Sequence, residues 1–383
     1  MLRPVTDVLV KPAGPDCNLA CEYCFYSGKE RLFPGSKMRM NDEVLESMVS
    51  QLMSQPVEQL SIGWQGGEPT LMGIPFFLKA LGLMQRYGKG MAVANGLQTN
   101  GVLIDRDWAR VFKEFHFLVG LSIDGPEHIH DHYRRGRGGQ GSFKKAADAA
   151  KLLFDNEVEV NALTVVNDYS VRFPEEIYEF HKSMGLNFMQ FIPCVETDIA
   201  NPEKTAAFSV KGIAYGKFLC RMFDLWLADF SNGVPTTSIR FFESLLFKYA
   251  GFPPTECTLL AECGTYVVIE HNGDVYACDF FVEPEWNLGN LLTTSLVSLA
   301  NSVKQRQFGR LKSELPADCQ ACEWRELCRG GCTKDRRRDP TSGNLNHFCS
   351  AFRIFFPHAD KHLRRLAGDW KRRQEGARYA PGL

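Results

Sequence analysis

The sequence predicts an α/β fold followed by a cysteine-rich region. Three observations support this. Strand-like and helical segments alternate through the first half, 44% of the 383 residues are apolar, and most of the 13 cysteines gather toward the end. Strand–helix units with right-handed crossovers form either a doubly wound sheet or a curved partial barrel. Both arrangements place their chemistry at the carboxyl ends of the strands.

Six segments have the composition of strands buried on both faces, since they are short and rich in Val, Ile, Leu and Phe. They are residues 7–11, 59–64, 92–98, 117–123, 157–166 and 187–192. Helical spacing predicts helices between them at residues 41–55, 75–87, 105–115, 142–156 and 174–184. In the first helix, Asn41 or Asp42 supplies the cap.

The pattern changes after about residue 200. Helical segments at residues 205–230 and 239–249 lead to a hairpin, with strands at 266–270 and 275–278 around the turn pair Asn272-Gly273. The basic tail, residues 361–378, is helix-like. Its simplest interpretation is a solvated helix face, and a site for an anionic partner is the alternative.

Charge and hydropathy restrict the partners. The formal net charge of −1 predicts no bulk attraction to nucleic acid or to anionic membranes. No run of about 18 apolar residues is present, so no membrane span is expected. The beginning, Met1-Leu2-Arg3-Pro4, lacks the apolar segment of a signal peptide. We therefore expect a cytoplasmic protein, whose thiols stay reduced.

Eleven of the cysteines form two arrays. Cys17, Cys21 and Cys24 follow the first strand, and the second array comprises Cys257, Cys263, Cys278, Cys319, Cys322, Cys328, Cys332 and Cys349. Three thiolates hold a four-iron cluster with one iron left open, and eight complete two further clusters. Zinc is the alternative ligand, because Cys319-x2-Cys322 alone also fits a zinc ribbon. Cys194 and Cys220 lie outside both arrays and are expected to pack in the core.

The triplet Cys17-x3-Cys21-x2-Cys24, with Tyr23 before its last cysteine, resembles the signature of radical S-adenosylmethionine (SAM) enzymes. The second array resembles the C-terminal module called SPASM, and Cys257 with the pair Cys278-Asp279 makes the chain look most like the anaerobic sulfatase-maturating enzymes. The resemblance implies a partial (β/α)6 TIM-like barrel with a C-terminal SPASM domain. The domain boundaries we expect are 1–200 for the barrel, 201–255 for a helical bridge, 256–350 for SPASM and 351–383 for a helical tail.

The resemblance also implies three [4Fe-4S] clusters and bound SAM, which is cleaved to methionine and a 5′-deoxyadenosyl radical. The triplet would hold the reactive cluster. Cys257, Cys263, Cys278 and Cys332 would hold the first auxiliary cluster, and Cys319, Cys322, Cys328 and Cys349 the second. Spacing alone leaves this partition open.

Further positions match the family's SAM contacts. The glycine motif Gly66-Gly67-Glu68 follows the second strand, where the backbone would approach the methionine amino group. Ser122 and Arg134 would contact polar groups of SAM, with a surface charge as the alternative for Arg134. Val195 matches an adenine contact or, equally, plain packing. Tyr26 and Gln65 match positions near the peptide substrate.

Asp279 is the candidate catalytic base. Oxidation of a Ser or Cys side chain to the aldehyde level removes a hydrogen atom, a proton and an electron, and a nearby carboxylate would take the proton. The alternative is that Asp279 has only a structural role, as an aspartate in a turn. The implied function is therefore conversion of a Ser or Cys in an unfolded sulfatase polypeptide to Cα-formylglycine, with a reducing donor such as flavodoxin or ferredoxin. The alternatives are another peptide-modifying SPASM enzyme, which forms thioether or carbon–carbon cross-links, an electron-transfer protein, and a zinc-stabilised binding module.

Overall fold

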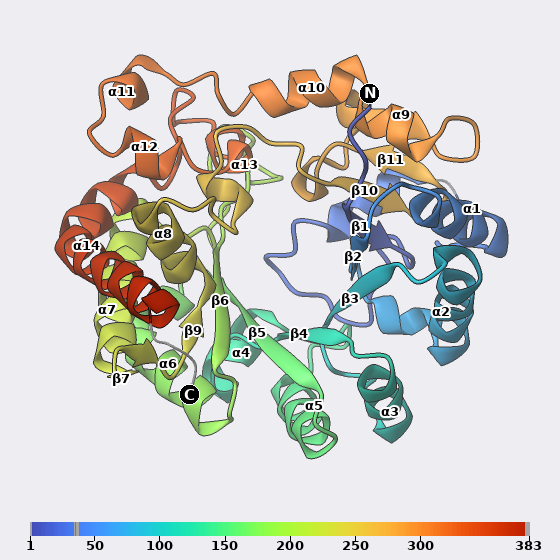
Figure 1. Ribbon diagram of the computed structural model, residues 1–383, viewed down its shortest axis with the longest axis horizontal. Helices are drawn as coiled ribbons and strands as arrows, with labels where there is room; N and C mark the ends of the chain where they lie inside the picture. Colours follow the sequence, from blue (N-terminus) through green and yellow to red (C-terminus); the bar gives the residue numbers. More distant parts are fainter. Residues whose placement is uncertain (1, 34, 36–37, 380–383) are drawn as a thin grey trace. The chain divides into compact units, whose positions relative to one another are not determined.

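The computed structural model describes residues 2–33, 35 and 38–379. It contains two compact units (Figure 1). Unit 1 comprises Met1–Ile123, Glu127–Ala162 and Gly264–Arg310, and unit 2 comprises Asp124–Pro126, Leu163–Cys263 and Leu311–Leu383. These units follow spatial contacts, so the four segments expected from the sequence stay a prediction.

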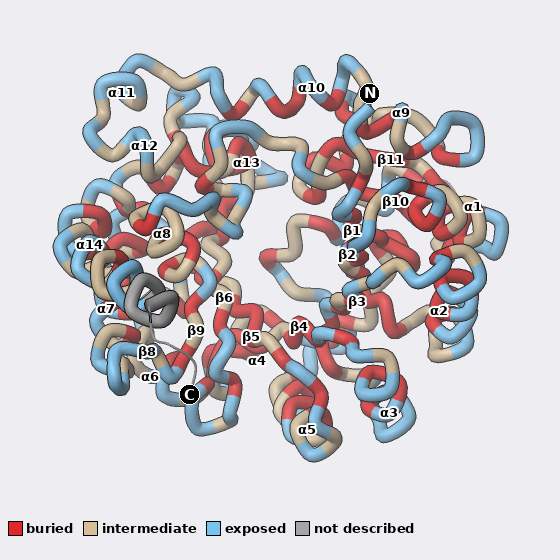
Figure 2. The backbone as a smooth tube through the Cα atoms, viewed as in Figure 1, coloured by how far each residue is buried: buried red, intermediate tan, exposed pale blue. Residues whose placement is uncertain are grey.

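Unit 1 is built on a mostly parallel sheet with the strand order β12-β11-β10-β1-β2-β3-β4. Its strands are β1 (Asp7–Lys11), β2 (Gln59–Trp64), β3 (Ala92–Thr99), β4 (Leu118–Ser122), β10 (Val267–Glu270), β11 (Asp274–Tyr276) and β12 (Asn287–Asn290). The five strands from β10 to β4 pair in parallel, and β11 and β12 extend the edge antiparallel. All four residues of β10 are buried, and in β1 Val8, Val10 and Lys11 are buried, Leu9 is half-buried and Asp7 is exposed (Figure 2).

The predicted hairpin is confirmed, because β10 and β11 pair antiparallel around Asn272 and Gly273. Gly273 has φ +86°, a conformation that favours glycine. The sequence did not predict where this hairpin lies. Val267 of β10 pairs in parallel with Val8 of β1, so the hairpin completes the N-terminal sheet.

Helices cover this sheet. They are α1 (Asp42–Met53), α2 (Ile74–Gly88), α3 (Arg106–Glu114), α4 (Glu127–Tyr133), α5 (Phe143–Asp155), α9 (Leu296–Ala300) and α10 (Val303–Arg310). Asn41 is the cap of α1, since its Oδ1 accepts a hydrogen bond from the Val44 N–H at 2.9 Å. α1 and α2 lie side by side along β1–β3 (Figure 1). The predicted strands and helices agree with these bounds to within two residues, whereas α4, α9, α10 and strand β12 were not predicted.

Strand β5 (Glu159–Val166) begins in unit 1 and ends in unit 2. The other strands of unit 2 are β6 (Phe188–Pro193), β7 (Phe230–Ser231), β8 (Val234–Pro235) and β9 (Ser238–Ile239). Its helices are α6 (Pro174–Ser183), α7 (Gly212–Ala228), α8 (Arg240–Ala250), α11 (Ala317–Gln320), α12 (Arg325–Cys328), α13 (Thr333–Arg337) and α14 (Cys349–Tyr379). The predicted helix at 205–230 was wrong at its start, because residues 205–210 bond back to the segment after β6.

An aromatic core holds the helices of unit 2 together. The ring of Phe355 in α14 lies 5.7 Å from that of Phe223 in α7 and 5.5 Å from that of Phe242 in α8. Gly216 lets α7 approach α14, since a Cβ there would lie 2.9 Å from the Ala351 Cα. Offset and edge-on ring contacts add to the stability that burial provides.

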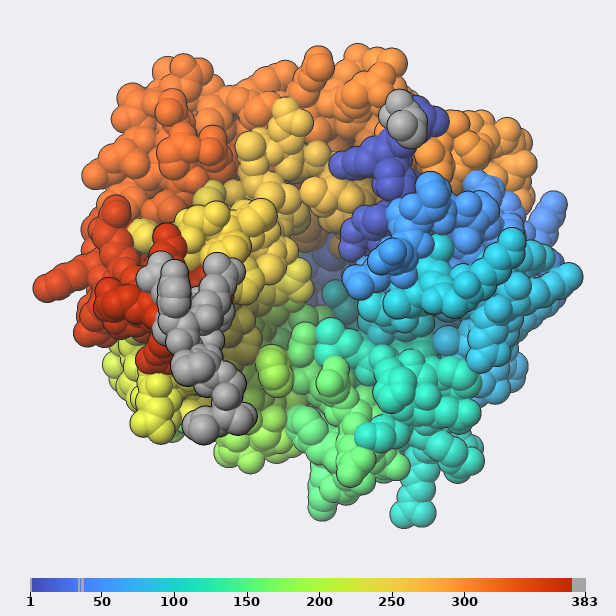
Figure 3. Space-filling model, in the orientation of Figure 1, coloured from blue at the N-terminus to red at the C-terminus, as the bar shows by residue number. Residues whose placement is uncertain are grey.

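Helix α14 begins earlier than predicted. It begins at Cys349 and contains Pro357, whereas the helix-like pattern of the sequence was placed at residues 361–378 and the helical tail as a whole at 351–383. Its outer side carries exposed ion pairs within the helix, such as Arg364–Asp360 and Arg372–Asp369, and its atoms lie at the surface in red in Figure 3. These pairs support the solvated-face interpretation for the residues described. Among the described residues, no helix has both the length and the apolar character that a membrane crossing requires.

We predict that Phe355→Ala lowers the free energy of unfolding by about 3–5 kcal/mol, because it leaves a cavity at the junction of α14, α7 and α8. The measurement is anaerobic denaturant unfolding followed by circular dichroism. The control is Ile213→Ala on the exposed side of α7, for which a change of about 0.5 kcal/mol or less is expected. Equal effects of the two variants would contradict this account of the core.

Candidate active site

The first cysteine array lies in a loop that begins where β1 ends, in unit 1. Backbone hydrogen bonds hold the loop against the segment after α4, from the Ala20 N–H to the Arg135 carbonyl (2.8 Å) and from the Glu22 N–H to the Tyr133 carbonyl (3.2 Å). All three cysteines are half-buried. The loop is therefore held against this segment by its own main chain.

The sulfur of Cys17 has polar contacts with two neighbouring residues. It accepts a hydrogen bond from the Leu19 N–H at 3.4 Å and lies 3.7 Å from Nδ2 of Asn100. Burial raises the pKa of the Cys17 thiol to about 12, and the Leu19 N–H opposes this shift only in part. Metal binding at this loop must therefore displace a proton.

Gly66 and Gly67, at the end of β2, lie against the start of the cysteine loop. A Cβ on Gly67 would lie only 2.0 Å from the Asp16 carbonyl oxygen, and Gly66 has φ +129°. The Gly67 N–H donates to the Gly14 carbonyl at 2.8 Å, and the Glu68 N–H donates to the Asp16 carbonyl at 2.9 Å. Both glycines are thus required by the close approach of two backbones. This packing role is additional to the SAM contact that the sequence suggested.

Glu68 is a buried carboxylate at the same strand end. Its oxygens accept hydrogen bonds from the Thr70 N–H and hydroxyl, from the Thr99 hydroxyl (2.9 Å) and from the Asn100 N–H (2.8 Å). Burial raises the pKa of Glu68, and these donors oppose the shift. The side chain of Asn100 then donates to Asn18 Oδ1 at 2.7 Å. Glu68 thereby connects the ends of β2 and β3 to the cysteine loop.

Arg134 is buried, which rules out its interpretation as a solvated surface charge. Its guanidinium carbon lies 5.5 Å from the centre of the Tyr23 ring, so the aromatic residue of the triplet faces this cation. Ser122 is the last residue of β4 and is half-buried. In unit 2, Val195 follows β6 and is fully buried.

Asp279 is next to Cys278 in the extension of the unit 1 sheet. Its side chain is largely buried, and Oδ1 lies 2.5 Å from the ammonium nitrogen of Lys11, the last residue of β1. Lys11 is itself buried, and its nitrogen lies 3.8 Å from the centre of the Tyr26 ring. A buried charged group requires a partner of opposite charge, so Lys11 holds the Asp279 side chain in a defined position.

Tyr26 and Gln65 both lie near this ion pair but differ in their surroundings. The Tyr26 hydroxyl donates to the Glu270 carboxylate, and burial, followed by Glu270, raises the pKa of Tyr26 well above its ordinary value. Tyr26 packs with Phe33, Val268, Tyr276 and Val282, so its hydroxyl and ring serve the core of unit 1. The buried Gln65 donates its N–H to the Val10 carbonyl at 2.9 Å.

Four cysteines of the second array surround one cavity in unit 2. Cys319, Cys322, Cys328 and Cys349 line it together with Trp324, Phe352 and Phe356. Within the described ranges, no three His, Cys, Asp or Glu side chains stand close enough to bind a single metal ion. These four sulfurs instead line the walls of a cavity, as ligands of a multi-iron cluster do. The donor set fits the second auxiliary cluster.

Of the other four cysteines, Cys257, Cys263 and Cys332 belong to unit 2 and Cys278 to unit 1. The three in unit 2 share one buried cation, Lys312. Burial lowers the pKa of Lys312, and the negative charge of the three thiolates opposes this shift. Its ammonium donates to the carbonyls of Cys257 and Thr258, at 2.5 and 2.7 Å. A cation beside thiolates balances the negative charge of a thiolate-bound cluster. The remaining two cysteines differ, since Cys194 is buried and Cys220 half-buried.

Sequence reasoning missed Lys11, Glu270 and Lys312. A signal existed for the first two, because a charged residue ends each of two otherwise apolar strands, VLVK and VVIE. The parallel register then places Lys11 opposite Glu270. No local pattern distinguishes Lys312 from a surface lysine.

Comparison with known proteins agrees with this geometry. A model described as the radical SAM superfamily matches residues 12–181, and a model described as SPASM, an iron-sulfur cluster-binding domain, matches residues 261–323. The cysteine loop after β1, the strand-end carboxylate and the second cysteine array thus define a radical SAM enzyme with an iron–sulfur-binding domain. The predicted α/β fold with these two domains is confirmed.

Individual relatives define the family. The serine-type anaerobic sulfatase-maturating enzyme of Bacteroides thetaiotaomicron is 37% identical, covering 93% of this chain and 90% of that protein. The cysteine-type enzyme of Clostridium perfringens is also 37% identical, covering 96% of this chain and 100% of that protein. The solved structure of native anSMEcpe with bound AdoMet and Cp18Cys peptide has a TM-score of 0.88 over 96% of this chain and 100% of that chain. This chain belongs to the anaerobic sulfatase-maturating enzymes.

We predict that Gly67→Ala displaces the cysteine loop, because the new Cβ overlaps the Asp16 carbonyl. Iron bound at Cys17, Cys21 and Cys24 should be lost while the iron of the second array remains. Anaerobic iron and sulfide analysis with electron paramagnetic resonance measures this. Gly82→Ala is the control, since a Cβ there meets nothing within 4 Å and helix propensity favours alanine by about 1 kcal/mol. Full iron content in Gly67→Ala would show that the loop tolerates the shift.

Proposed function

We propose that this chain oxidises a Ser or Cys side chain of an unfolded sulfatase polypeptide to Cα-formylglycine. The observation that carries the proposal is the buried Asp279 carboxylate, held by Lys11 beside Cys278 in a chain of this family. The two relatives named above are of the serine and the cysteine type and are equally similar to this chain. The proposal therefore covers both target residues.

The cofactors are SAM and three [4Fe-4S] clusters, as the two domains and the family imply. Cys17, Cys21 and Cys24 would hold the reactive cluster, and the second array would hold the two auxiliary ones. When bound and reduced, this set supplies the 5′-deoxyadenosyl radical that removes one hydrogen atom from the target Cβ. We further propose a reducing donor such as flavodoxin or ferredoxin, and a cytoplasmic setting in which the thiols stay reduced.

The residues of the chain have separate tasks in this proposal. Glu68 and Arg134 supply a buried carboxylate and a buried guanidinium, which suit the amino and carboxylate groups of the methionine moiety. Ser122 supplies a hydroxyl at a neighbouring strand end, and Val195 an apolar surface for adenine. Gln65, next to the glycine turn, would contact the peptide, and Tyr26 would support that region from the core.

Asp279 would accept the proton of the target hydroxyl or thiol. The Lys11 ammonium lies 2.5 Å from Oδ1 and fixes the direction of the Asp279 side chain. The overall oxidation removes a hydrogen atom, a proton and an electron from the target side chain. With Ser this gives the aldehyde directly; with Cys it gives a thioaldehyde, which water hydrolyses to the aldehyde and hydrogen sulfide. The expected cluster ligand Cys278 directly precedes the proposed base, which suits an acceptor for that electron.

The test is anaerobic incubation of the reduced holoenzyme with paired peptides of one sulfatase sequence, carrying Ser or Cys at the target position. We expect aldehyde on at least one peptide, detected by mass spectrometry and hydrazide labelling, together with 5′-deoxyadenosine. The variant with Cys17, Cys21 and Cys24 all replaced by alanine is the control and should form neither product. A cross-linked peptide without aldehyde would assign the chain to another peptide-modifying activity.

We predict that Asp279→Ala reduces aldehyde formation by about 100-fold to 10,000-fold, the usual contribution of a general base. Cleavage of SAM should persist, so the ratio of 5′-deoxyadenosine to aldehyde should rise. Parallel chromatography of both products measures the ratio. Glu58→Gln, at an exposed acid of unit 1, should leave it unchanged. An unchanged ratio in Asp279→Ala would remove Asp279 from the mechanism.

A further inference from the structure

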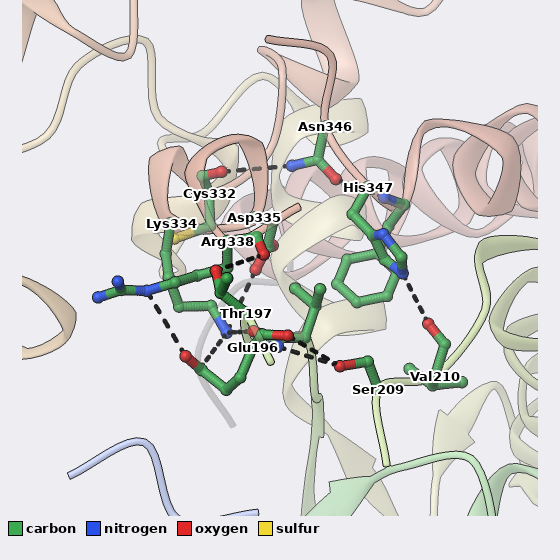
Figure 4. A network of polar contacts seen from close by, with 12 residues as sticks. Glu196, Thr197, Ser209, Val210, Cys332, Lys334, Asp335, Arg338, Asn346 and His347 are labelled. Atoms are coloured by element: carbon green, nitrogen blue, oxygen red, sulfur yellow. Dashed lines mark hydrogen bonds and ion pairs between the residues drawn. The ribbon is translucent and has the colours of Figure 1, made fainter. Parts of the chain in front are cut away.

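A buried group of ions in unit 2 joins the segment after β6 to helix α13 (Figure 4). We call Lys334, Asp335, Arg338 and Glu196 the Lys334 cluster. The Lys334 ammonium donates to the Val195 carbonyl at 3.0 Å and pairs with the carboxylates of Glu196 (3.3 Å) and Asp335 (3.5 Å). Lys334 and Asp335 are buried, at 5% and 7% exposure, and Glu196 is half-buried.

The contact between the two segments extends over three consecutive residues. Besides the Val195 carbonyl, Arg338 Nε lies 3.5 Å from Glu196 Oε2, and the Thr197 hydroxyl donates to the Arg338 carbonyl at 2.8 Å. On its other side, Glu196 donates its N–H to the Ser209 hydroxyl at 3.1 Å. The segment after β6 therefore has little freedom to move independently of α13.

Helix α13 is tied just as closely to the cysteine-bearing backbone. It starts directly after Cys332, whose carbonyl accepts a hydrogen bond from Asn346 Nδ2 at 3.3 Å. The same amide group donates to the Gly330 carbonyl at 3.1 Å. Thr333, the first residue of the helix, has its hydroxyl 3.6 Å from the sulfur of Cys263. A shift of the Cys332 loop must therefore move α13.

The charges of the Lys334 cluster suit positioning better than stabilisation. Two cations face two carboxylates, so the buried group is formally neutral. Desolvation of such a group offsets most of the Coulomb attraction, and an apolar replacement is often as stable. Removal of one partner, however, leaves an uncompensated buried charge. The Lys334 cluster thus fixes α13 and the segment after β6 relative to each other.

We propose that Lys334 is a positioning residue that couples SAM binding at the segment after β6 to iron–sulfur binding at Cys332. The inference rests on the proposed function in one respect, namely that Val195 contacts the adenosyl moiety and Cys332 is a cluster ligand. An iron–sulfur cluster bound at Cys332 would hold α13 in place. Lys334 on α13 would then hold the Val195 carbonyl through its hydrogen bond. Because binding free energies are reciprocal, SAM also favours the occupied state of the Cys332 site.

The test is a double-mutant cycle on SAM affinity, measured by anaerobic equilibrium dialysis without peptide. In the wild-type background, Cys332→Ala should weaken SAM binding by about fivefold or more, the lower range of typical couplings. In the Lys334→Met background, Cys332→Ala should cause no further weakening. An equal fold-loss in both backgrounds, or no loss in either, would overturn the proposal.

Controls separate positioning from misfolding. Arg337→Met changes an exposed arginine of the same helix and should leave SAM affinity unchanged. Thr197→Val removes one hydroxyl contact without touching a charge or a cysteine, and should weaken SAM binding less than Lys334→Met. Iron analysis must show that the Cys17 cluster is retained in each variant. If Thr197→Val and Lys334→Met bind SAM with wild-type affinity, the Lys334 cluster has no positioning role.

These outcomes are independent of the peptide reaction. Non-additive SAM affinities without aldehyde formation would keep the coupling and reject the proposed substrate. Aldehyde formation with additive affinities would keep the substrate and reject the coupling.

Discussion

The contact between the cysteine loop and the turn after β2 is the constraint on which the candidate site depends. Two backbones approach there so closely that a single methyl group on Gly67 would overlap the Asp16 carbonyl. The hydrogen bonds that the Gly67 and Glu68 N–H groups donate at this contact place Cys17 next to the Glu68 and Asn100 side chains. The geometry of the cysteine loop is therefore set by main-chain atoms in the segments that follow β1 and β2. The side chains of Glu68 and Asn100 then supply a carboxylate and an amide group beside this fixed main chain.

Buried lysines in both units lie beside carboxylate or thiol groups. Lys11 pairs with Asp279, Lys312 lies among three thiols, and Lys334 pairs with two carboxylates. Such pairs add little to stability, because desolvation offsets attraction. They do restrict the paired side chains to one arrangement. A radical reaction requires such fixed surroundings, because the radical must react with the target and with no other group. The aromatic core of α7, α8 and α14 provides stability separately.

Much of the fold could be predicted from the sequence, because alternating apolar strands and amphipathic helices are local patterns. The bounds of β1 and β2 were predicted without error, and the cap of α1 was narrowed to Asn41 or Asp42, of which Asn41 is correct. The parallel pairing of β10 with β1 could not be predicted, since nothing local records a partner so distant in sequence. The start of α7 was misjudged because residues 205–210 bond to the segment after β6, a tertiary preference that overrides helix propensity. The cysteine arrays were recognisable from spacing, whereas Lys11 and Lys334 matter only through partners that folding brings together.

The pairing of β1 with β10 also bears on how the chain is made. Val8 leaves the ribosome early, and its partner Val267 follows only after most of the protein has been synthesised. At ordinary elongation rates of about 5–20 residues per second, that interval exceeds about ten seconds. During it, β1 presents an unpaired edge, the kind of surface that promotes aggregation. This edge of the nascent N-terminal half is covered only when the hairpin of β10 and β11 docks against β1.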